Sequence, residues 1–231
     1  MQEIRLVLCA LAVSLFTGGP AFALGSASAA SSASSERLDE ILAEMDKAGK
    51  RLKTMTADFV QTDHDFLLKD QEETRGKLYL ALPGRVRWEH SPPKEKVLVV
   101  KDDLVRVYNP TARQVHEFKR GQGSKSGGAD LLIGFGSNSE TIRKNYDVSL
   151  SGETDSDATL ALVPKPDSKA SLFTKIELTL DKKTWTPVRS VFHSPNRNRA
   201  DIRFQNVSLN REVPADTFEL KLPPNVEIIR N

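Results

Sequence analysis

Apolar and polar positions alternate in several short runs between Gly76 and Tyr108. Alternation with a period of two residues is typical of a strand that buries one face. The runs are separated by a proline-glycine pair, a proline pair and an aspartate pair, all of which favour turns. The apolar members of the runs include Leu78, Leu80, Leu82, Val86, Trp88, Leu98 and Val100. The pattern predicts an antiparallel meander whose apolar face must be covered or offered to a ligand.

The apolar alternation continues on both sides of this meander. An earlier strand is expected to contain Phe59, and Ile176, Leu178 and Phe204 belong to later strands. Those later strands are expected at residues 148–150, 159–163, 175–180, 188–193, 201–207 and 218–222. The predicted fold class is mainly β with helices. Its main element is a curved antiparallel sheet of about eleven strands, which forms an incomplete barrel.

Two helices are expected to accompany the sheet. Ser35 can cap an N-terminal helix with an acidic first turn and apolar residues at helical spacing. These apolar residues are Leu38, Ile41, Leu42, Met45, Ala48 and Leu52. Asn138 can cap a second, short helix that runs to Tyr146. One face of the first helix should pack on the sheet.

Residues 1–23 have the pattern of a secretory signal peptide. An arginine precedes an apolar run, and Ala21-Phe22-Ala23 fits the rule for a cleavage site, with Ala27-Ser28-Ala29 as a second candidate. The apolar run is much shorter than the roughly 20 residues that span a bilayer. Cys9, the only cysteine, lies in this run, so the exported protein is expected to contain no thiol. We therefore expect export to the periplasm of a Gram-negative bacterium.

Composition sets the expected organisation of the exported chain. Residues 24–35 are almost entirely Gly, Ala and Ser, which predicts a flexible linker. Residues 36–231 are long enough for one domain with a large core or cavity. The net charge of +2 gives no reason to expect nucleic acid as a partner.

The sequence offers little for catalysis. It has no nucleophile elbow, no His-Glu-x-x-His element and no phosphate-binding loop. Asp63-His64-Asp65 resembles a metal-binding triplet, but adjacent strand residues point to opposite faces and would not converge on one ion. We therefore expect a protein that is not an enzyme and uses no metal or cofactor.

Short motifs in a fixed order resemble those of a known family. In that family a Phe-x-Gln element precedes a Gly-x-Leu strand, a proline turn, a strand that ends in tryptophan, and an aromatic-Asn-Pro end. The matching segments are Phe59-Val60-Gln61, Gly76-Lys77-Leu78, Pro83 to Trp88, Tyr108-Asn109-Pro110, Phe204-Gln205-Asn206-Val207, Pro214 to Phe218 and Pro223-Pro224-Asn225-Val226. With these segments the sequence resembles the LolA family of periplasmic lipoprotein carriers.

The resemblance implies a carrier that ferries lipoproteins from the inner to the outer membrane and holds their acyl chains in a hydrophobic cavity. It also implies a monomer that works with an inner-membrane ABC release complex and an outer-membrane acceptor. A carrier of a different lipid, or a lipid-binding regulatory sensor of the same fold, remains the alternative. The candidate cavity residues are Phe59, Leu78, Leu80, Leu82, Val86, Trp88, Leu98, Val100, Ile176, Leu178 and Phe204. Ordinary core packing is the competing interpretation of these side chains.

A glycine-rich stretch at residues 121–128 precedes an apolar segment bounded by glycines at residues 129–136. The resemblance places a short helical lid here, and an ordinary helix that caps the core is the alternative. The candidate lid residues are Leu131, Leu132, Ile133 and Phe135.

Leu82 departs from the family pattern. Family members typically have an arginine immediately before the turn proline, and this arginine is implicated in holding the lid closed. A leucine cannot donate hydrogen bonds to lid carbonyls. We therefore expect a lid held by apolar contact, over a cavity that is more open or differently closed.

Overall fold

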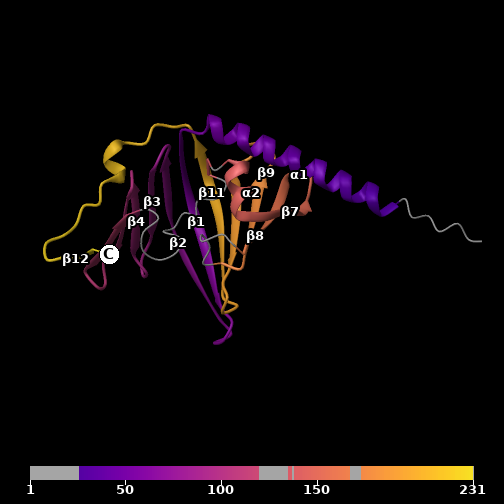
Figure 1. Ribbon diagram of the computed structural model, residues 1–231. Coiled ribbons are helices and arrows are strands. Elements are labelled where there is room, and N and C mark those ends of the chain that lie inside the picture. Colours follow the sequence, from indigo (N-terminus) through magenta and orange to yellow (C-terminus); the bar gives the residue numbers. More distant parts are fainter. Residues whose placement is uncertain (1–25, 120–134, 137, 167–172, 231) are drawn as a thin grey trace, which may run out of the picture.

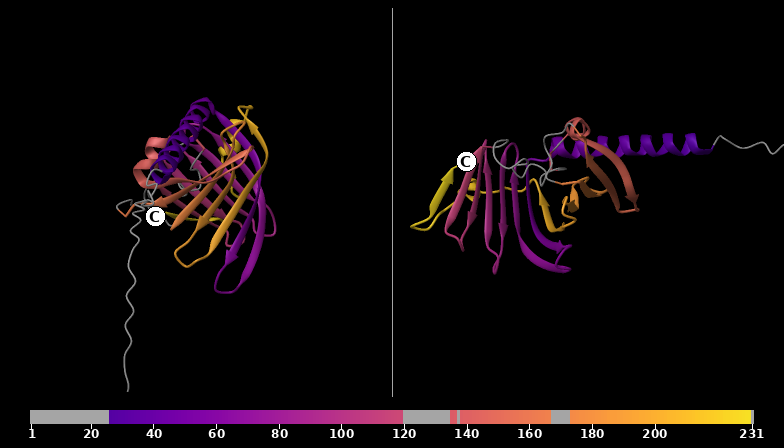
Figure 2. Two further views of the ribbon diagram at one scale, coloured as in Figure 1. Left: turned by 90° about the vertical axis from the view of Figure 1, so that its right-hand side faces the viewer. Right: turned by 60° about the horizontal axis from the view of Figure 1, so that its bottom comes forward.

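The computed structural model describes residues 26–119, 135–136, 138–166 and 173–230, with side chains from residue 34 onward. Within these ranges, twelve strands form one sheet in the order β12-β6-β5-β4-β3-β2-β1-β11-β10-β9-β8-β7. β12 pairs in parallel with β6, and the other neighbouring strands are antiparallel. The edge strands β12 and β7 do not pair with each other, so the curved sheet stays open (Figures 1 and 2).

The elements have the following bounds. The strands are β1 (Thr54–Asp65), β2 (Asp70–Ala81), β3 (Arg85–His90), β4 (Lys96–Lys101), β5 (Leu104–Asn109), β6 (Gln114–Lys119), β7 (Tyr146–Glu153), β8 (Asp157–Pro164), β9 (Lys175–Asp181), β10 (Pro187–His193), β11 (Arg199–Leu209) and β12 (Glu227–Arg230). The helices are α1 (Ser26–Arg51), α2 (Ser139–Asn145) and a single 3-10 turn, η2 (Ala215–Phe218).

The predicted meander is confirmed, because β2 to β6 are consecutive neighbours in the sheet. The first hairpin is longer than its apolar pattern indicated, since β1 continues to Asp65 and β2 begins at Asp70. Its outer half is polar, and the ladder of backbone pairs continues to its end. Cross-strand pairing therefore outweighs side-chain propensity there.

The strand predicted at residues 218–222 is wrong. Phe218 ends the 3-10 turn η2, and its side chain is buried. η2 contacts β3 and β4, where Arg87 donates to the backbone oxygens of Thr217 and Glu219. Prolines flank this segment and restrict strand pairing, so the last strand of the sheet is β12 instead.

Helix α1 runs along one end of the sheet (Figure 1). It begins at Ser26 and not after a cap at Ser35, so most of the segment predicted as a linker is helical. Alanine recurs throughout this segment and has the highest helix propensity. The second half of α1 buries Ile41, Leu42 and Met45 in the hydrophobic core, as its periodicity predicted.

Polar contacts fix both helices. Arg37 in α1 lies 2.6 Å from Glu153 in β7, which also pairs with Lys182. Hydrogen bonds from these two cations lower the pKa of Glu153 to about 2. Asn138 caps α2 as predicted, because its side chain accepts from the backbone N–H of Thr141 at 2.7 Å.

The core lies on one face of the sheet, called the inner face below. One cross-strand row consists of Leu80, Val86, Val100 and Val105. The next row consists of Leu78, Trp88, Leu98 and Val107. All of these side chains are buried except Leu98 and Val107, which are half-buried. The register confirms that the apolar residues of the meander share one face, as strand parity predicted.

Candidate functional site

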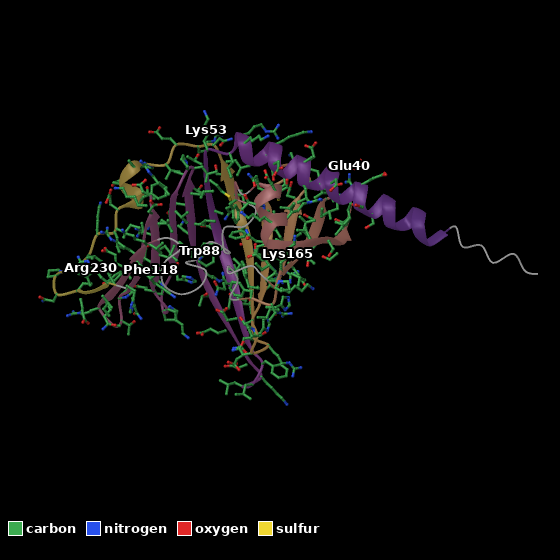
Figure 3. All side chains as sticks on the ribbon, viewed as in Figure 1. Glu40, Lys53, Trp88, Phe118, Lys165 and Arg230 are labelled. Carbon is green, nitrogen blue, oxygen red and sulfur yellow. The ribbon has the colours of Figure 1, made fainter. Side chains whose placement is uncertain are left out.

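Four aromatic side chains meet at the centre of the inner face: Phe59, Trp88, Phe135 and Phe204. The ring centroids of Phe59 and Trp88 are 5.1 Å apart, and those of Trp88 and Phe204 are 6.0 Å apart. Phe135 packs edge-on against Phe204 at 5.2 Å. All four are buried, and Trp88 lies near the middle of the sheet (Figure 3). We call these four residues the aromatic cluster.

Gly76 makes room for the aromatic cluster. It pairs with Phe59 across β1 and β2, and the phenylalanine ring lies over it. A Cβ atom at Gly76 would lie 2.5 Å from Cζ of Phe59 and 1.9 Å from the backbone oxygen of Glu89. Only glycine fits beneath the ring, which gives the Gly-x-Leu element of the sequence a physical reason.

A pocket of about 250 Å³ lies beside the cluster on the inner face. It is lined by Gln61, Trp88, His90, Lys96, Leu98, Phe173, Phe192, Ala200 and Ile202. These residues come from β1, β3, β4, β10 and β11, together with Phe173 just before β9. The walls are mainly apolar, and Gln61, His90 and Lys96 supply its polar groups.

Trp88, one of the residues that line the pocket, has an unused hydrogen-bond donor. Its Nε1 atom is buried and has no partner among the described residues. An indole N–H is a donor only, and leaving such a group buried and unpaired costs roughly 1–3 kcal/mol. This donor would gain a partner only if a rearrangement of the site brought an acceptor oxygen to it.

His90 is held in its neutral form beside the cluster. Burial lowers its pKa, and Lys96 lowers it further, whereas Asp63 acts in the opposite direction. Its ring packs edge-on against Phe59 with centroids 5.0 Å apart. A neutral imidazole suits an apolar pocket better than a charged one.

The lowered pKa of His90 predicts that stability depends on pH. Below the ordinary pKa of 6.5 the unfolded chain binds more protons than the folded chain. The free energy of unfolding should therefore fall between about pH 7.5 and about pH 5.5, a window above the ordinary carboxylate pKa values. In urea titrations, the free energy of unfolding of His90→Gln should decrease less over this pH range than that of the wild type. The same substitution at the exposed His116 is the control, and equal behaviour of the two variants would contradict the prediction.

The chain after Phe135 is held by close contacts. Gly136 has a φ of +77°, and a Cβ atom there would lie 2.6 Å from Cδ1 of Leu82. A Cβ atom on Gly49 of α1 would lie 3.4 Å from the Gly136 Cα. Gly136 is thus wedged between the helix and the β2–β3 turn. Leu82 makes an apolar contact with the backbone at this point.

Residues 50–221 match the family model for the outer membrane lipoprotein carrier protein LolA. The chain belongs to the LolA family. A relative named outer-membrane lipoprotein carrier protein from Azotobacter vinelandii is 27% identical over 216 residues, which cover 94% of this chain and 97% of the relative. A relative of the same name from Pseudomonas aeruginosa is 28% identical over 217 residues, with the same coverage.

One solved structure extends the comparison to the fold. An uncharacterized conserved protein from Thermus thermophilus has a TM-score of 0.55 at 15% identity. The match covers 84% of this chain and 99% of that protein. The LolA-family resemblance and the predicted fold class are therefore confirmed.

The predicted cavity residues of this LolA-family chain occupy three places. Trp88 and Leu98 line the pocket. Leu82 is half-buried beside Gly136. The others lie in the continuous core: Phe59, Leu78, Leu80, Val86, Val100, Ile176, Leu178 and Phe204. Of the predicted lid, Leu131, Leu132 and Ile133 lie outside the described residues, and Phe135 belongs to the aromatic cluster.

Several pocket residues were not predicted from the sequence. Strand parity could have found Gln61 and Ile202, which lie two residues from Phe59 and Phe204. Phe192 pairs with Ile176, so only knowledge of the pairing of β9 and β10 reveals its place.

Two further observations hold for the described residues alone. None of their helices combines the length and the apolar character needed to cross a bilayer. Their His, Cys, Asp and Glu side chains form no group of three that could hold a metal ion. In the Asp63-His64-Asp65 triplet, His64 instead contacts Nη2 of Arg199 at 2.9 Å, and Asp63 accepts from Gln61.

Proposed function

We propose that this protein is a carrier that binds the acyl chains of lipoproteins on the inner face of its sheet and shuttles them toward the outer membrane. The observation that carries this proposal is the mainly apolar pocket beside the aromatic cluster on the inner face. The names of the relatives support the same role. Burial of hydrocarbon contributes roughly 0.8 kcal/mol per methylene, so no catalytic group is needed.

Loading requires more room on the inner face than the pocket offers. The pocket of about 250 Å³ is below the roughly 300–1,000 Å³ of typical ligand pockets. Phe135 fills space on the same face, directly against Phe204. We propose that an incoming acyl chain displaces Phe135, and that the predicted cavity residues in the core then line the enlarged site.

The carrier role sets the proposed location and partners. Removal of residues 1–23 would deliver a monomeric, non-enzymatic domain to the periplasm. An inner-membrane ABC complex would load it, and an outer-membrane acceptor would receive the cargo. The contact between Leu82 and Gly136 supports a lid that is held by apolar packing.

The fluorescence of Trp88 tests the proposal. The chain contains two tryptophans, so Trp185→Phe isolates the signal of Trp88. An acyl-chain probe should change this emission in a saturable way, and an unlabelled acylated peptide should reverse the change. Mass spectrometry of material that copurifies with the exported protein should find acylated species. An unchanged emission together with no copurified lipid would contradict the carrier role.

A further inference from the structure

The turn between β1 and β2 exposes a continuous apolar segment. Phe66, Leu67 and Leu68 are 47%, 84% and 73% exposed. The other exposed large apolar residues of the described chain, Val163 and Ile228, lie singly. Turns normally carry polar residues and glycine, so three adjacent exposed apolar side chains at a turn need an explanation. We call residues 66–68 the apolar tip.

The apolar tip projects from the molecule. Figure 1 shows the β1–β2 hairpin extending beyond the rest of the sheet, at the end opposite α1. Along β1, Phe59 belongs to the aromatic cluster, Gln61 lines the pocket, and the tip follows Asp65. The pocket therefore lies between the cluster and the tip.

Hydrogen bonds hold the apolar tip in place. The backbone N–H of Leu68 donates to Asp65 at 2.8 Å, and that of Phe66 donates to Asn198 at 3.0 Å. The side chain of Asn198 donates in turn to Asp65 at 3.2 Å. The guanidinium carbon of Arg197 lies 3.6 Å from the ring centroid of Phe66. The tip is thus tied to the β10–β11 turn and presents its apolar residues in a defined conformation.

Three cations lie near the apolar tip, among carboxylates that include Asp65 and Asp70. Lys69, Arg197 and Arg199 form no ion pair with a carboxylate in the part of the chain that the structure describes. The carboxylates of Asp65 and Asp70 accept hydrogen bonds from backbone N–H groups of the turn, and no salt bridge joins them to these three cations. Exposed Phe and Leu residues beside unpaired Lys and Arg are typical of segments that bind an anionic bilayer surface.

The shape of the tip favours a bilayer over a protein partner. Three side chains on a convex turn can bury only a few hundred Å². A stable protein interface needs roughly 800 Å² on each side. A bilayer sets no such requirement, because its interface accepts apolar side chains of any shape while its headgroup phosphates attract the cations.

We propose that the apolar tip is a membrane contact. It inserts Phe66, Leu67 and Leu68 into the interface of an anionic bilayer. The surrounding cations meet the phosphate headgroups, and the pocket end of the sheet then faces the membrane. This contact goes beyond the carrier role, and it does not require bound cargo.

Vesicle binding tests the proposal. The exported chain should cosediment with vesicles of phosphatidylethanolamine and phosphatidylglycerol, and less with phosphatidylcholine alone. Exposing or burying one leucine changes a partition constant by roughly ten- to a hundredfold. The double variant Leu67→Asp with Leu68→Asp should therefore bind at least about tenfold more weakly. A Leu67→Trp variant should be quenched by lipids brominated on their acyl chains.

Matched controls make the outcome decisive. Val163→Asp with Ile228→Asp changes two other exposed apolar residues, away from the tip, and should keep wild-type binding. Lys69→Glu with Arg197→Glu should weaken binding to anionic vesicles only. Failure of the wild-type chain to bind anionic vesicles, or equal loss in the Val163 and Ile228 control, would overturn the proposal. Acyl-probe binding without vesicles should be unchanged in the tip variants, so the tip and the carrier role can fail separately.

Discussion

Gly76→Ala is expected to lower the free energy of unfolding by about 3 kcal/mol or more, measured by urea titration. The new Cβ atom would lie 1.9 Å from the backbone oxygen of Glu89, far inside contact distance. That oxygen belongs to the β2–β3 ladder and cannot move without breaking cross-strand pairs. The same atom would also displace Phe59, so the aromatic cluster would lose its packing together with the sheet register.

Gly152→Ala is the matched control, because Gly152 also lies in a strand. A Cβ atom there would have no atom within 4 Å. Alanine also has less freedom to lose on folding than glycine, so we expect no loss of stability, or a gain of up to about 1 kcal/mol. Equal destabilisation by the two substitutions would show that glycine content, and not the close approach to Glu89 and Phe59, controls the stability of the sheet.

Much of the fold could be predicted because its strands follow a period of two. Val86 and Trp88 lie two residues apart in β3, and the residues that pair with them in β2 and β4 are also apolar. Alternation alone therefore places both side chains on the inner face. The strand prediction for residues 218–222 was wrong because Phe218 is buried at the end of a 3-10 turn that contacts β3 and β4. A local apolar pattern cannot distinguish this tertiary contact from a strand.

The site could be predicted only in part, because burial and cavity lining have the same sequence pattern. Phe59 and Trp88 share strand spacing and apolar character, yet only Trp88 reaches the pocket. The apolar tip has an unusual composition for a turn, and its exposure depends on the extension of β1 to Asp65, which the apolar pattern does not indicate. The sequence shows Gly136 only as a glycine that bounds the apolar segment, because its contact with Leu82 depends on the folded positions of two distant segments.

Phe135→Ala should change stability and cargo affinity in opposite directions. Phe135 is 3% exposed and packs on Phe204, so its truncation should lower the free energy of unfolding by about 3 kcal/mol. The acyl chain is proposed to displace this ring, so binding to the wild-type protein includes the free-energy cost of separating Phe135 from Phe204. This cost is smaller in the variant because alanine makes fewer contacts. Its affinity for an acyl probe should therefore rise by at least about tenfold.

Phe218→Ala separates this effect from general destabilisation. Phe218 is 2% exposed, but it packs with η2 against β3 and β4, away from the pocket. Its truncation should cost similar stability and leave probe affinity unchanged. A carrier must also release its cargo, so the tighter binding of Phe135→Ala should appear as slower release to acceptor vesicles. If both variants bind and release the probe like the wild type, Phe135 is an ordinary core residue, and the acyl chain enters without displacing it.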